Sequence, residues 1–188
     1  NSEGIVRKTA NLGWGYKEVK KELENLTGWQ VVVGNDANVA ALGEMWKGAG
    51  HGEKNMVMVT LGTGVGGGVI MGGRPLIGAN GAGGEIGHIC VNYFEEKCCG
   101  CGKKGCLEQY ASATGIARIA REHLTADKKD SILRTYDWDK IDAKIVFDAL
   151  KEGDLLAVDV VEEFGEYLAK GLADVAVVVD PSLFVIGG

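Results

Sequence analysis

The feature that most constrains this sequence is residues 87–109 (GHICVNYFEEKCCGCGKKGCLEQ), a short stretch that holds all five cysteines of the chain. Cys99, Cys101 and Cys106 stand among glycines and lysines, a composition too cramped and glycine-rich for core packing. A disulfide, a redox pair or a metal site could explain them. Nothing in the sequence suggests secretion, and C-x-C spacing favours a metal over a bridge between near neighbours. With His88 as the fourth ligand, these residues predict a closed, tetrahedral, structural zinc site.

The other two cysteines have no place in that ligand set. Cys98 and Cys101 show the C-x-x-C spacing of a redox pair, but the surrounding glycines favour a metal knuckle instead. We therefore interpret Cys90 and Cys98 as ordinary loop or core residues. A zinc-bound His88 keeps a second ring nitrogen that is free for an outer contact or for a substrate.

The composition excludes several classes of function. A formal net charge of −6 and a pI near 5.1 argue against a surface for nucleic acid or anionic membrane. No apolar stretch approaches the roughly 18 residues of a membrane span. With 46% hydrophobic residues in 188, the chain can bury a sizeable core. We expect a cytoplasmic protein. The first residue is Asn1 and the last four are VIGG, so we expect an internal piece of a longer protein.

Periodicity and turn signals predict an α/β chain without internal repeats. Residues 125–140 read as a polar surface loop with a short helix, and 78–85 as a flexible glycine-rich loop. The expected helices are 17–27, 36–48, 110–124, 141–153 and 154–179. The expected strands are 30–35, 88–91, 183–188 and two strands within 56–71 around a glycine turn.

That glycine turn, within LGTGVGGG (61–68), fits the dinucleotide pattern G-x-G-x-x-G by letter. The match is weak, because the dinucleotide fingerprint must open a helix and here the chain continues as a strand. It is not a P-loop either, since no Gly-Lys-Ser/Thr follows. Gly62, Thr63 and Gly64 could offer backbone N–H groups and a hydroxyl to an anion, or could form a plain hairpin. The residues alone leave both possibilities open.

Three carboxylates each have both a functional and a purely structural explanation. Asp36 follows a predicted strand and starts a helix, where it could accept a hydroxyl proton in phosphoryl transfer or could simply cap the helix. Glu85 and Glu108 could bind sugar hydroxyls, or could be solvated loop acids. Two carboxylates also occur in glycoside hydrolases, but a phosphate turn would then have no purpose.

Taken together, these segments resemble the ROK family, which joins sugar kinases and sugar-responsive repressors. GNDANVAALGE (34–44) looks like its catalytic segment, and LGTGVGGGVI (61–70) like its second phosphate motif. GGEIGH (83–88) with CGCGKKGCLE (99–108) looks like its signature of sugar ligands and zinc. Within the family, EQYASATGIAR (108–118) is most similar to the bacterial glucokinases. The resemblance covers essentially the whole chain.

The resemblance implies an actin-like ATPase (ribonuclease H-like) fold of two lobes. Residues 1–34 would end the small lobe, and residues 35–188 would form the large lobe with its zinc-stapled loop, without the C-terminal part. The family's first phosphate loop, Asp-x-Gly-Gly-Thr, is missing from this sequence. We therefore expect the 188-residue chain alone to be inactive or nearly so, because lobe closure cannot exclude water.

The resemblance also implies roles for individual residues. Asp36 resembles the catalytic base that deprotonates the sugar 6-hydroxyl. The implied hexose ligands are Asn35, Asp36, Glu85, His88 and Glu108. The implied ATP-binding residues are Gly62, Thr63, Gly64, Gly187 and Gly188. The implied zinc ligands are His88, Cys99, Cys101 and Cys106.

The function that the resemblance implies is phosphorylation of a hexose by Mg-ATP, with glucose as the first candidate substrate. The assembly that it implies is a homodimer or a homotetramer. Alternatives within the family are a kinase for N-acetylmannosamine, fructose or allose, and a sugar-responsive repressor with a DNA-binding domain upstream. A zinc-stapled interaction module is a further reading, which leaves Asp36 without a purpose. We expect no membrane or nucleic-acid partner for this chain.

Overall fold

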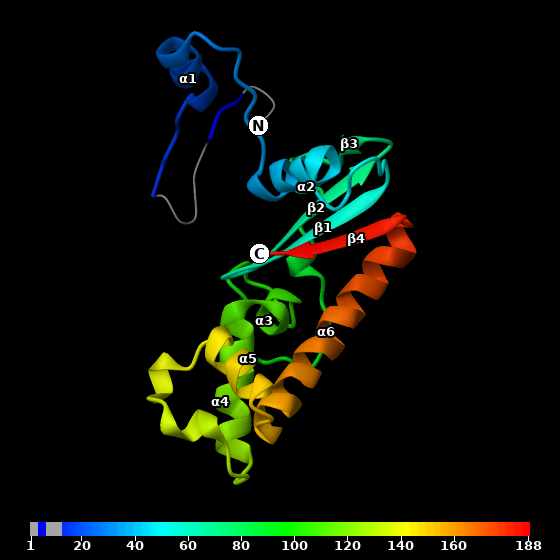
Figure 1. The fold of residues 1–188 in the computed structure, drawn as a ribbon. Helices are drawn as coiled ribbons and strands as arrows, with labels where there is room; N and C mark the ends of the chain where they lie inside the picture. Colours follow the sequence, from blue (N-terminus) through cyan, green and yellow to red (C-terminus); the bar gives the residue numbers. More distant parts are fainter. Residues whose placement is uncertain (1–3, 7–12) are drawn as a thin grey trace.

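The computed structural model describes residues 4–6 and 13–188, so part of the predicted small-lobe segment 1–34 lies outside the described residues. The helices are α1 (Val19–Thr27), α2 (Asp36–Lys47), α3 (Glu108–Ala111), α4 (Ala113–Ala126), α5 (Ala143–Lys151) and α6 (Leu155–Val179). The strands are β1 (Met56–Leu61), β2 (Val65–Met71), β3 (Arg74–Pro75) and β4 (Leu183–Gly187). Three short 3₁₀ helices complete the list: η1 (Ile86–His88), η2 (Ile132–Thr135) and η3 (Trp138–Lys140). The predicted α/β class is confirmed (Figure 1).

The four strands form one mixed sheet in the order β3-β2-β1-β4. β2 pairs antiparallel with both β1 and β3, whereas β4 pairs parallel with β1. A parallel partner requires a crossover connection. The long helix α6 supplies its last part, and Figure 1 shows it running back along the sheet before β4 begins.

Alternating side chains of β1 fill two separate cores, as a strand buried on both faces requires. Met56 and Met58 point to one face, where they pack with Ala41 of α2. Val57 and Val59 point to the opposite face, into a cluster with Val175 of α6. The sheet is therefore a middle layer between α2 and α6.

The glycines of β2 allow its neighbours to come unusually close. A Cβ added to Gly68 would lie 2.5 Å from the carbonyl oxygen of Ala37 and 2.5 Å from the Cβ of Ala41, both in α2. A Cβ added to Gly67, on the opposite face, would collide with Gly84 and Ile86. Because a strand presents successive positions to opposite faces, the glycine run seats α2 on one face and the 84–86 segment on the other.

Away from the sheet, α4, α5 and α6 pack into a helical layer of their own. Leu156 and Val160 of α6 meet Ile119 of α4 and Val146 of α5 in its core. Ile116, Ile119 and Ala120 of α4 are all buried, so they form its inner face.

Each of these three helices begins at a side chain that accepts a backbone N–H, which removes one unpaired donor from the first turn. Ser112 accepts from Gly115, Asp142 from Ile145 and Asp154 from Ala157. Among the described residues, no helix is both long and apolar enough to cross a membrane.

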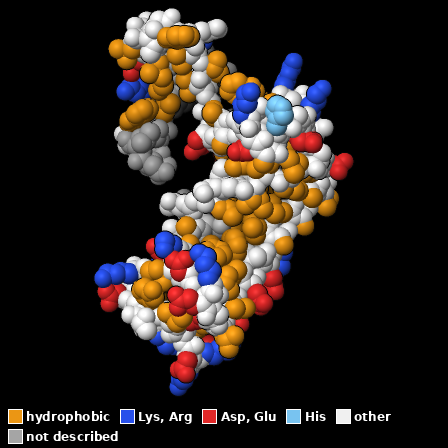
Figure 2. All heavy atoms as spheres, viewed as in Figure 1, with side chains coloured by type: hydrophobic (Ala, Val, Ile, Leu, Met, Phe, Trp, Pro, Cys, Tyr) orange, Lys and Arg blue, Asp and Glu red, His pale blue; other side chains and the backbone are white. Residues whose placement is uncertain are grey.

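The segment before α2 stands apart from the sheet (Figure 1). Helix α1 buries none of its residues, and Gly28 ends it in a left-handed conformation with φ 69°. Apolar side chains remain exposed along this segment, among them Trp29 and Val32, and a second apolar region lies over β4 and α6 (Figure 2).

Two predicted strands are wrong. Residues 30–35 are irregular, and Val32 is 89% exposed. An apolar run forms a strand only where a neighbour supplies backbone partners, and no described residue pairs with this one. Residues 88–91 are not a strand either: η1 ends at His88, and Cys90 makes one isolated bridge to Cys106.

The predicted helix 110–124 is two helices. The chain breaks between α3 and α4 at Ser112, whose extended backbone (φ −90°, ψ 165°) cannot continue a helix. The buried Ser112 hydroxyl then caps α4. Helical periodicity spans this break because the apolar positions on either side remain in phase.

We expect Gly68→Ala to destabilise the protein, because its new methyl group meets the backbone and a short side chain of α2 rather than a flexible tip. The expected loss is about 1–3 kcal/mol of unfolding free energy. Gly43→Ala is the matched control, since Gly43 lies in α2 with nothing within 4 Å of its added Cβ. That variant should be neutral or gain up to about 1 kcal/mol. Urea unfolding measures both, and equal stabilities would contradict this account of β2.

Candidate functional site

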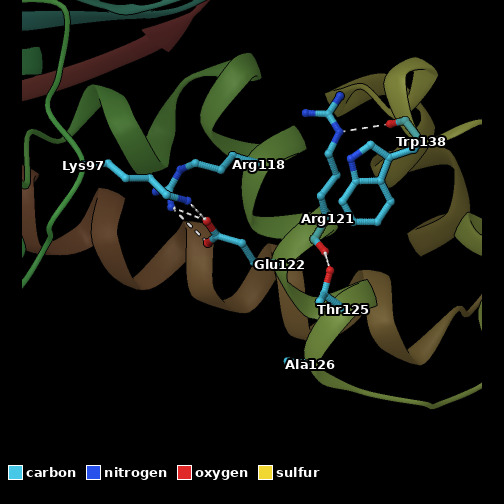
Figure 3. A pocket seen from close by; sticks show the side chains of 7 residues that line it. All are labelled: Lys97, Arg118, Arg121, Glu122, Thr125, Ala126 and Trp138. Carbon is cyan, nitrogen blue, oxygen red and sulfur yellow. Dashed lines mark hydrogen bonds and ion pairs between the residues drawn. The ribbon is translucent and has the colours of Figure 1, made fainter.

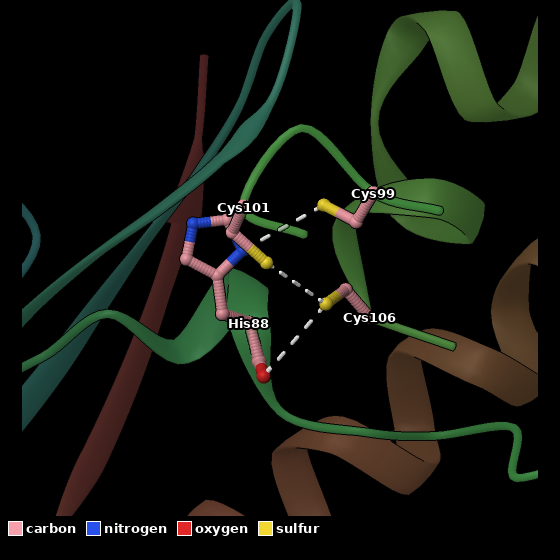
Figure 4. Close-up of side chains that lie close together, drawn as sticks. All are labelled: His88, Cys99, Cys101 and Cys106. Carbon is pink, nitrogen blue, oxygen red and sulfur yellow. Dashed lines mark hydrogen bonds between the residues drawn. The ribbon is translucent and has the colours of Figure 1, made fainter. Parts of the chain in front are cut away.

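The predicted zinc ligands gather into one cluster (Figure 4). The ligand atoms of His88, Cys99, Cys101 and Cys106 all lie within 4.8 Å of one another. The Cys101 and Cys106 sulfurs are 3.6 Å apart, and the Cys99 sulfur is 3.9 Å from Nδ1 of His88. In a tetrahedral zinc site with Zn–S bonds of about 2.3 Å, neighbouring sulfurs are about 3.8 Å apart. The donors and their spacing therefore fit one small divalent metal ion.

Burial affects the thiols of this cluster differently. Burial raises the pKa of Cys106 to about 12 and also raises the pKa of Cys99. The Cys101 thiol is exposed, and the backbone N–H of Lys103 lowers its pKa. Buried thiols deprotonate readily only beside positive charge, which a bound cation supplies. The chemistry of this donor set thus suits a metal ion.

The loop that carries the cysteines is fastened by Gln109. Its side-chain oxygen accepts from the Cys106 N–H at 3.0 Å, and its side-chain nitrogen donates to the Lys97 carbonyl at 3.0 Å. Cys98 is exposed and Cys90 is half-buried, and neither belongs to the four-residue cluster, as predicted.

Glu108 connects the cysteine cluster to the glycine turn. Its Oε1 lies 3.5 Å from the Cys99 sulfur, and its Oε2 accepts from the Val65 N–H at 3.1 Å. A Cβ on Gly64 would collide with the same carboxylate. The sequence pointed to Glu108 but did not indicate this bridge, because the contact joins residues 43 positions apart.

The segments carrying the other predicted ligands also meet β2. Ala37, next to Asp36, packs against Gly66 and Gly68, whereas Gly84, next to Glu85, packs against Gly67. Gly87, next to His88, lies against the Val65 carbonyl. The structure therefore brings the segments of Asp36, Glu85, His88 and Glu108 together around residues 64–68.

Asn35 rather than Asp36 caps α2. The Asn35 side chain accepts from the Asn38 N–H at 3.1 Å. The Asp36 side chain is exposed, and its Oδ1 accepts from the N–H of the next residue at 2.9 Å. Close by in the same turn, Oδ1 of Asn38 is buried and has no hydrogen-bond partner among the described residues. The cap explains Asn35 but leaves Asp36 available at the helix start.

The predicted nucleotide residues lie at one edge of the sheet. Gly62, Thr63 and Gly64 form the turn after β1, and Gly62 and Thr63 are exposed. Gly187 pairs with Thr60 of β1, and Gly188 lies against Leu61. Since β1 and β4 are parallel, their carboxyl ends share this edge, where α/β sheets commonly bind ligands.

A hollow of about 410 Å³ on the outer face of α4 is a separate feature (Figure 3). Its cations already have partners: Arg118 and Lys97 both bind Glu122, and Arg121 donates to the carbonyls of Trp138 and Ile141. None of its lining residues is a predicted ligand.

The fold and this site define an α/β domain of the ROK class. The ROK family model matches residues 1–188, and the chain belongs to the ROK family. The chain is 49% identical over 186 residues to a glucokinase of Halalkalibacterium halodurans, covering 98% of this chain and 56% of that protein. It thus spans little more than half the length of this curated relative.

Solved structures show the same fold. A ROK family glucokinase from Streptomyces griseus in complex with glucose and AMPPNP superposes with a TM-score of 0.85 at 38% identity, over 100% of this chain and 62% of that chain. A ROK family transcriptional regulator, a homologue of the E. coli MLC protein, superposes with a TM-score of 0.88 at 33% identity, over 99% of this chain and 46% of that chain. Both kinases and regulators therefore share this architecture.

Proposed function

We propose that this chain is part of an ATP-dependent hexose kinase that transfers a phosphoryl group to the 6-hydroxyl of glucose. The observation that carries the proposal is that strand β2 joins an exposed acid to an anion-type turn. Ala37, which follows the exposed Asp36, packs against Gly66 and Gly68 of β2, and the turn of residues 62–64 leads directly into the same strand. The similarity to two glucokinases, one of them solved with glucose and a nucleotide, supports this choice of substrates.

In this proposal Asp36 is the general base. Phosphoryl transfer to an alcohol needs positioned phosphates, screened charge and one carboxylate that takes the hydroxyl proton. Asp36 is suited to that role, because Asn35 already supplies the helix cap and, among the described residues, the Asp36 carboxylate accepts only from the N–H of the next residue, Ala37.

The hexose ligands in this proposal are Asn35, Glu85, His88 and Glu108 along with Asp36. Carboxylate oxygens each accept more than one hydrogen bond, which suits the several hydroxyls of a sugar. His88 turns Nδ1 toward the Cys99 sulfur, so its Nε2 is the nitrogen left for a hydroxyl. The buried Oδ1 of Asn38, which has no hydrogen-bond partner in the described part of the chain, is a further acceptor in the α2 turn.

The nucleotide phosphates would meet the N–H groups of the 62–64 turn, and Gly187 and Gly188 would lie beside the adenosine. Magnesium, when bound with ATP, would screen the charge of the phosphates. Gly62 has no neighbour within 4 Å of an added Cβ and no left-handed φ, so neither packing nor conformation inside the described chain requires a glycine there. Close approach of a ligand is the remaining reason for a glycine.

We assign the four-residue cluster to structural zinc. Four protein ligands close a tetrahedral site and leave no open position for chemistry. The ion would hold the loop in place. His88 and Glu108, which lie on and beside that loop, would thereby keep their orientation toward the sugar.

We further propose that residues 1–34 belong to a second lobe and residues 35–188 to the large lobe. The exposure of α1 and of Trp29 and Val32 supports a covering partner outside the described residues. Because the relatives are longer than this chain, the complete protein is the unit that the experiments require. A sugar-responsive repressor is the second candidate, supported by the likeness to the ROK regulator.

Asp36→Asn in the full-length protein should lower kcat for glucose phosphorylation by about 10²–10⁴-fold, the usual contribution of a general base. Its glucose Kd should change little, since an amide still hydrogen-bonds the sugar. Coupled kinase assays and calorimetric titration measure the two quantities, with the exposed Asp174→Asn as control. Equal losses in binding and turnover would contradict the base role, and a wild-type protein without kinase activity would favour the repressor.

The purified full-length protein should contain about one zinc per chain, as one closed tetrahedral site requires. Cys106→Ser should lose that zinc, whereas Cys98→Ser, outside the cluster, should retain it. Removal of the metal by a chelator should weaken glucose binding by loosening the loop around His88 and Glu108. Elemental analysis and glucose titration test this, and normal glucose binding and phosphorylation by metal-free protein would refute it.

A further inference from the structure

The 62–64 turn is anchored to the start of α4 through both of its first two carbonyl groups. The Ala113 N–H donates to the Gly62 carbonyl at 2.8 Å. The Thr114 hydroxyl donates to the Thr63 carbonyl at 3.0 Å. These bonds join residues about fifty positions apart, so the position of the turn depends on where α4 begins.

The hydrogen bonds made by the Thr114 and Ser112 hydroxyls have only one possible donor-to-acceptor direction. A carbonyl oxygen cannot donate, so the single Thr114 hydroxyl hydrogen must go to Thr63. Ser112, whose Oγ lies 3.0 Å from Oγ1 of Thr114, must therefore be the donor of that pair. Ser112 Oγ in turn accepts from the Gly115 N–H at 3.0 Å. A directed chain thus runs from the α4 backbone through a buried serine to the glycine turn.

Because the peptide bond is planar, fixing the two carbonyl groups also fixes the direction of the backbone N–H groups in the turn. In a trans peptide the C=O and the following N–H point in opposite directions, and no cis peptide bond occurs in the described chain. With the Gly62 and Thr63 carbonyls directed at α4, the N–H groups of Thr63 and Gly64 must point away from it. Neither N–H has a hydrogen-bond partner among the described residues.

We propose that Thr114 is a positioning residue for phosphate binding, which holds the 62–64 turn so that the Thr63 and Gly64 N–H groups face the nucleotide. The proposal rests on the kinase function proposed above and adds a residue outside the predicted ligand set. Thr114 acts through the turn and does not itself touch the nucleotide. A short hydroxyl side chain is required, because the acceptor is a backbone carbonyl beside the helix start.

The test compares three variants of the full-length protein: Thr114→Val, Thr114→Ser and Thr125→Val. Valine keeps the shape of threonine but removes the donor, whereas serine keeps the donor. Thr125 is the matched control, because it also lies in α4 and its hydroxyl also donates to a carbonyl, that of Arg121 at 2.9 Å. Calorimetry measures the Kd of a non-hydrolysable Mg-ATP analogue and, separately, the Kd of glucose.

Thr114→Val should weaken binding of the analogue by about three- to tenfold, as loss of one hydrogen bond to an oriented loop predicts. Its glucose Kd should stay within about twofold, and Thr114→Ser and Thr125→Val should bind both ligands like wild type.

An unchanged analogue Kd in Thr114→Val, an equal loss of affinity for glucose, or failure of serine to restore binding would overturn the positioning role. If the wild-type protein itself bound no nucleotide, the kinase proposal would fail together with this one. Normal wild-type activity with a neutral Thr114→Val would overturn this inference alone.

Discussion

The constraint on which the site depends is the run of three glycines, residues 66–68, in β2. Gly66 and Gly68 admit α2 on one face of the strand, and Gly67 admits the 84–86 segment on the other. A larger residue at Gly67 or Gly68 would force these layers to shift, because its Cβ would collide with backbone atoms of the neighbouring segment. The segments that carry Asp36 and Glu85 can approach the same strand because residues 66–68 of this strand have no side chains in the way. The segments that carry the predicted ligands thus come together because their backbones lie directly against the glycine run of β2.

Glu108 is the second element that ties the site together. One carboxylate oxygen faces the Cys99 sulfur and the other accepts the N–H at the start of β2. The residue therefore links the cysteine loop to the strand that follows the glycine turn. A structural metal in that loop would stiffen not only the loop but also, through Glu108, the turn proposed to meet phosphates. This gives a physical reason why a metal without chemistry of its own matters for the kinase that we propose.

Local patterns predicted most of the fold. The long helix α6 and the two strands around the glycine turn follow from hydrophobic periodicity and turn signals alone. The cysteine spacing predicted the cluster, because its ligands lie close in sequence. The failures at 30–35 and 88–91 occurred where the structure depends on partners distant in the chain. The break at Ser112 was missed because the residues after it, Ala113 and Thr114, donate to carbonyls of the distant turn at residues 62–64.

The roles of Ser112 and Thr114 could not be predicted from the sequence for the same reason: they depend on contacts between residues distant in the chain. A serine two positions before a threonine at a helix start is an ordinary capping pattern, and nothing local says that the second hydroxyl leaves the helix. Only the contact with Thr63 shows it. The proposed sugar side and the proposed phosphate side are then held from two neighbouring helix starts. Glu108 opens α3 and accepts from the N–H at the start of β2, whereas Thr114, in the first turn of α4, donates to the turn before β2. The short connection between α3 and α4 therefore links the residue proposed to bind the sugar to the turn proposed to meet the phosphates.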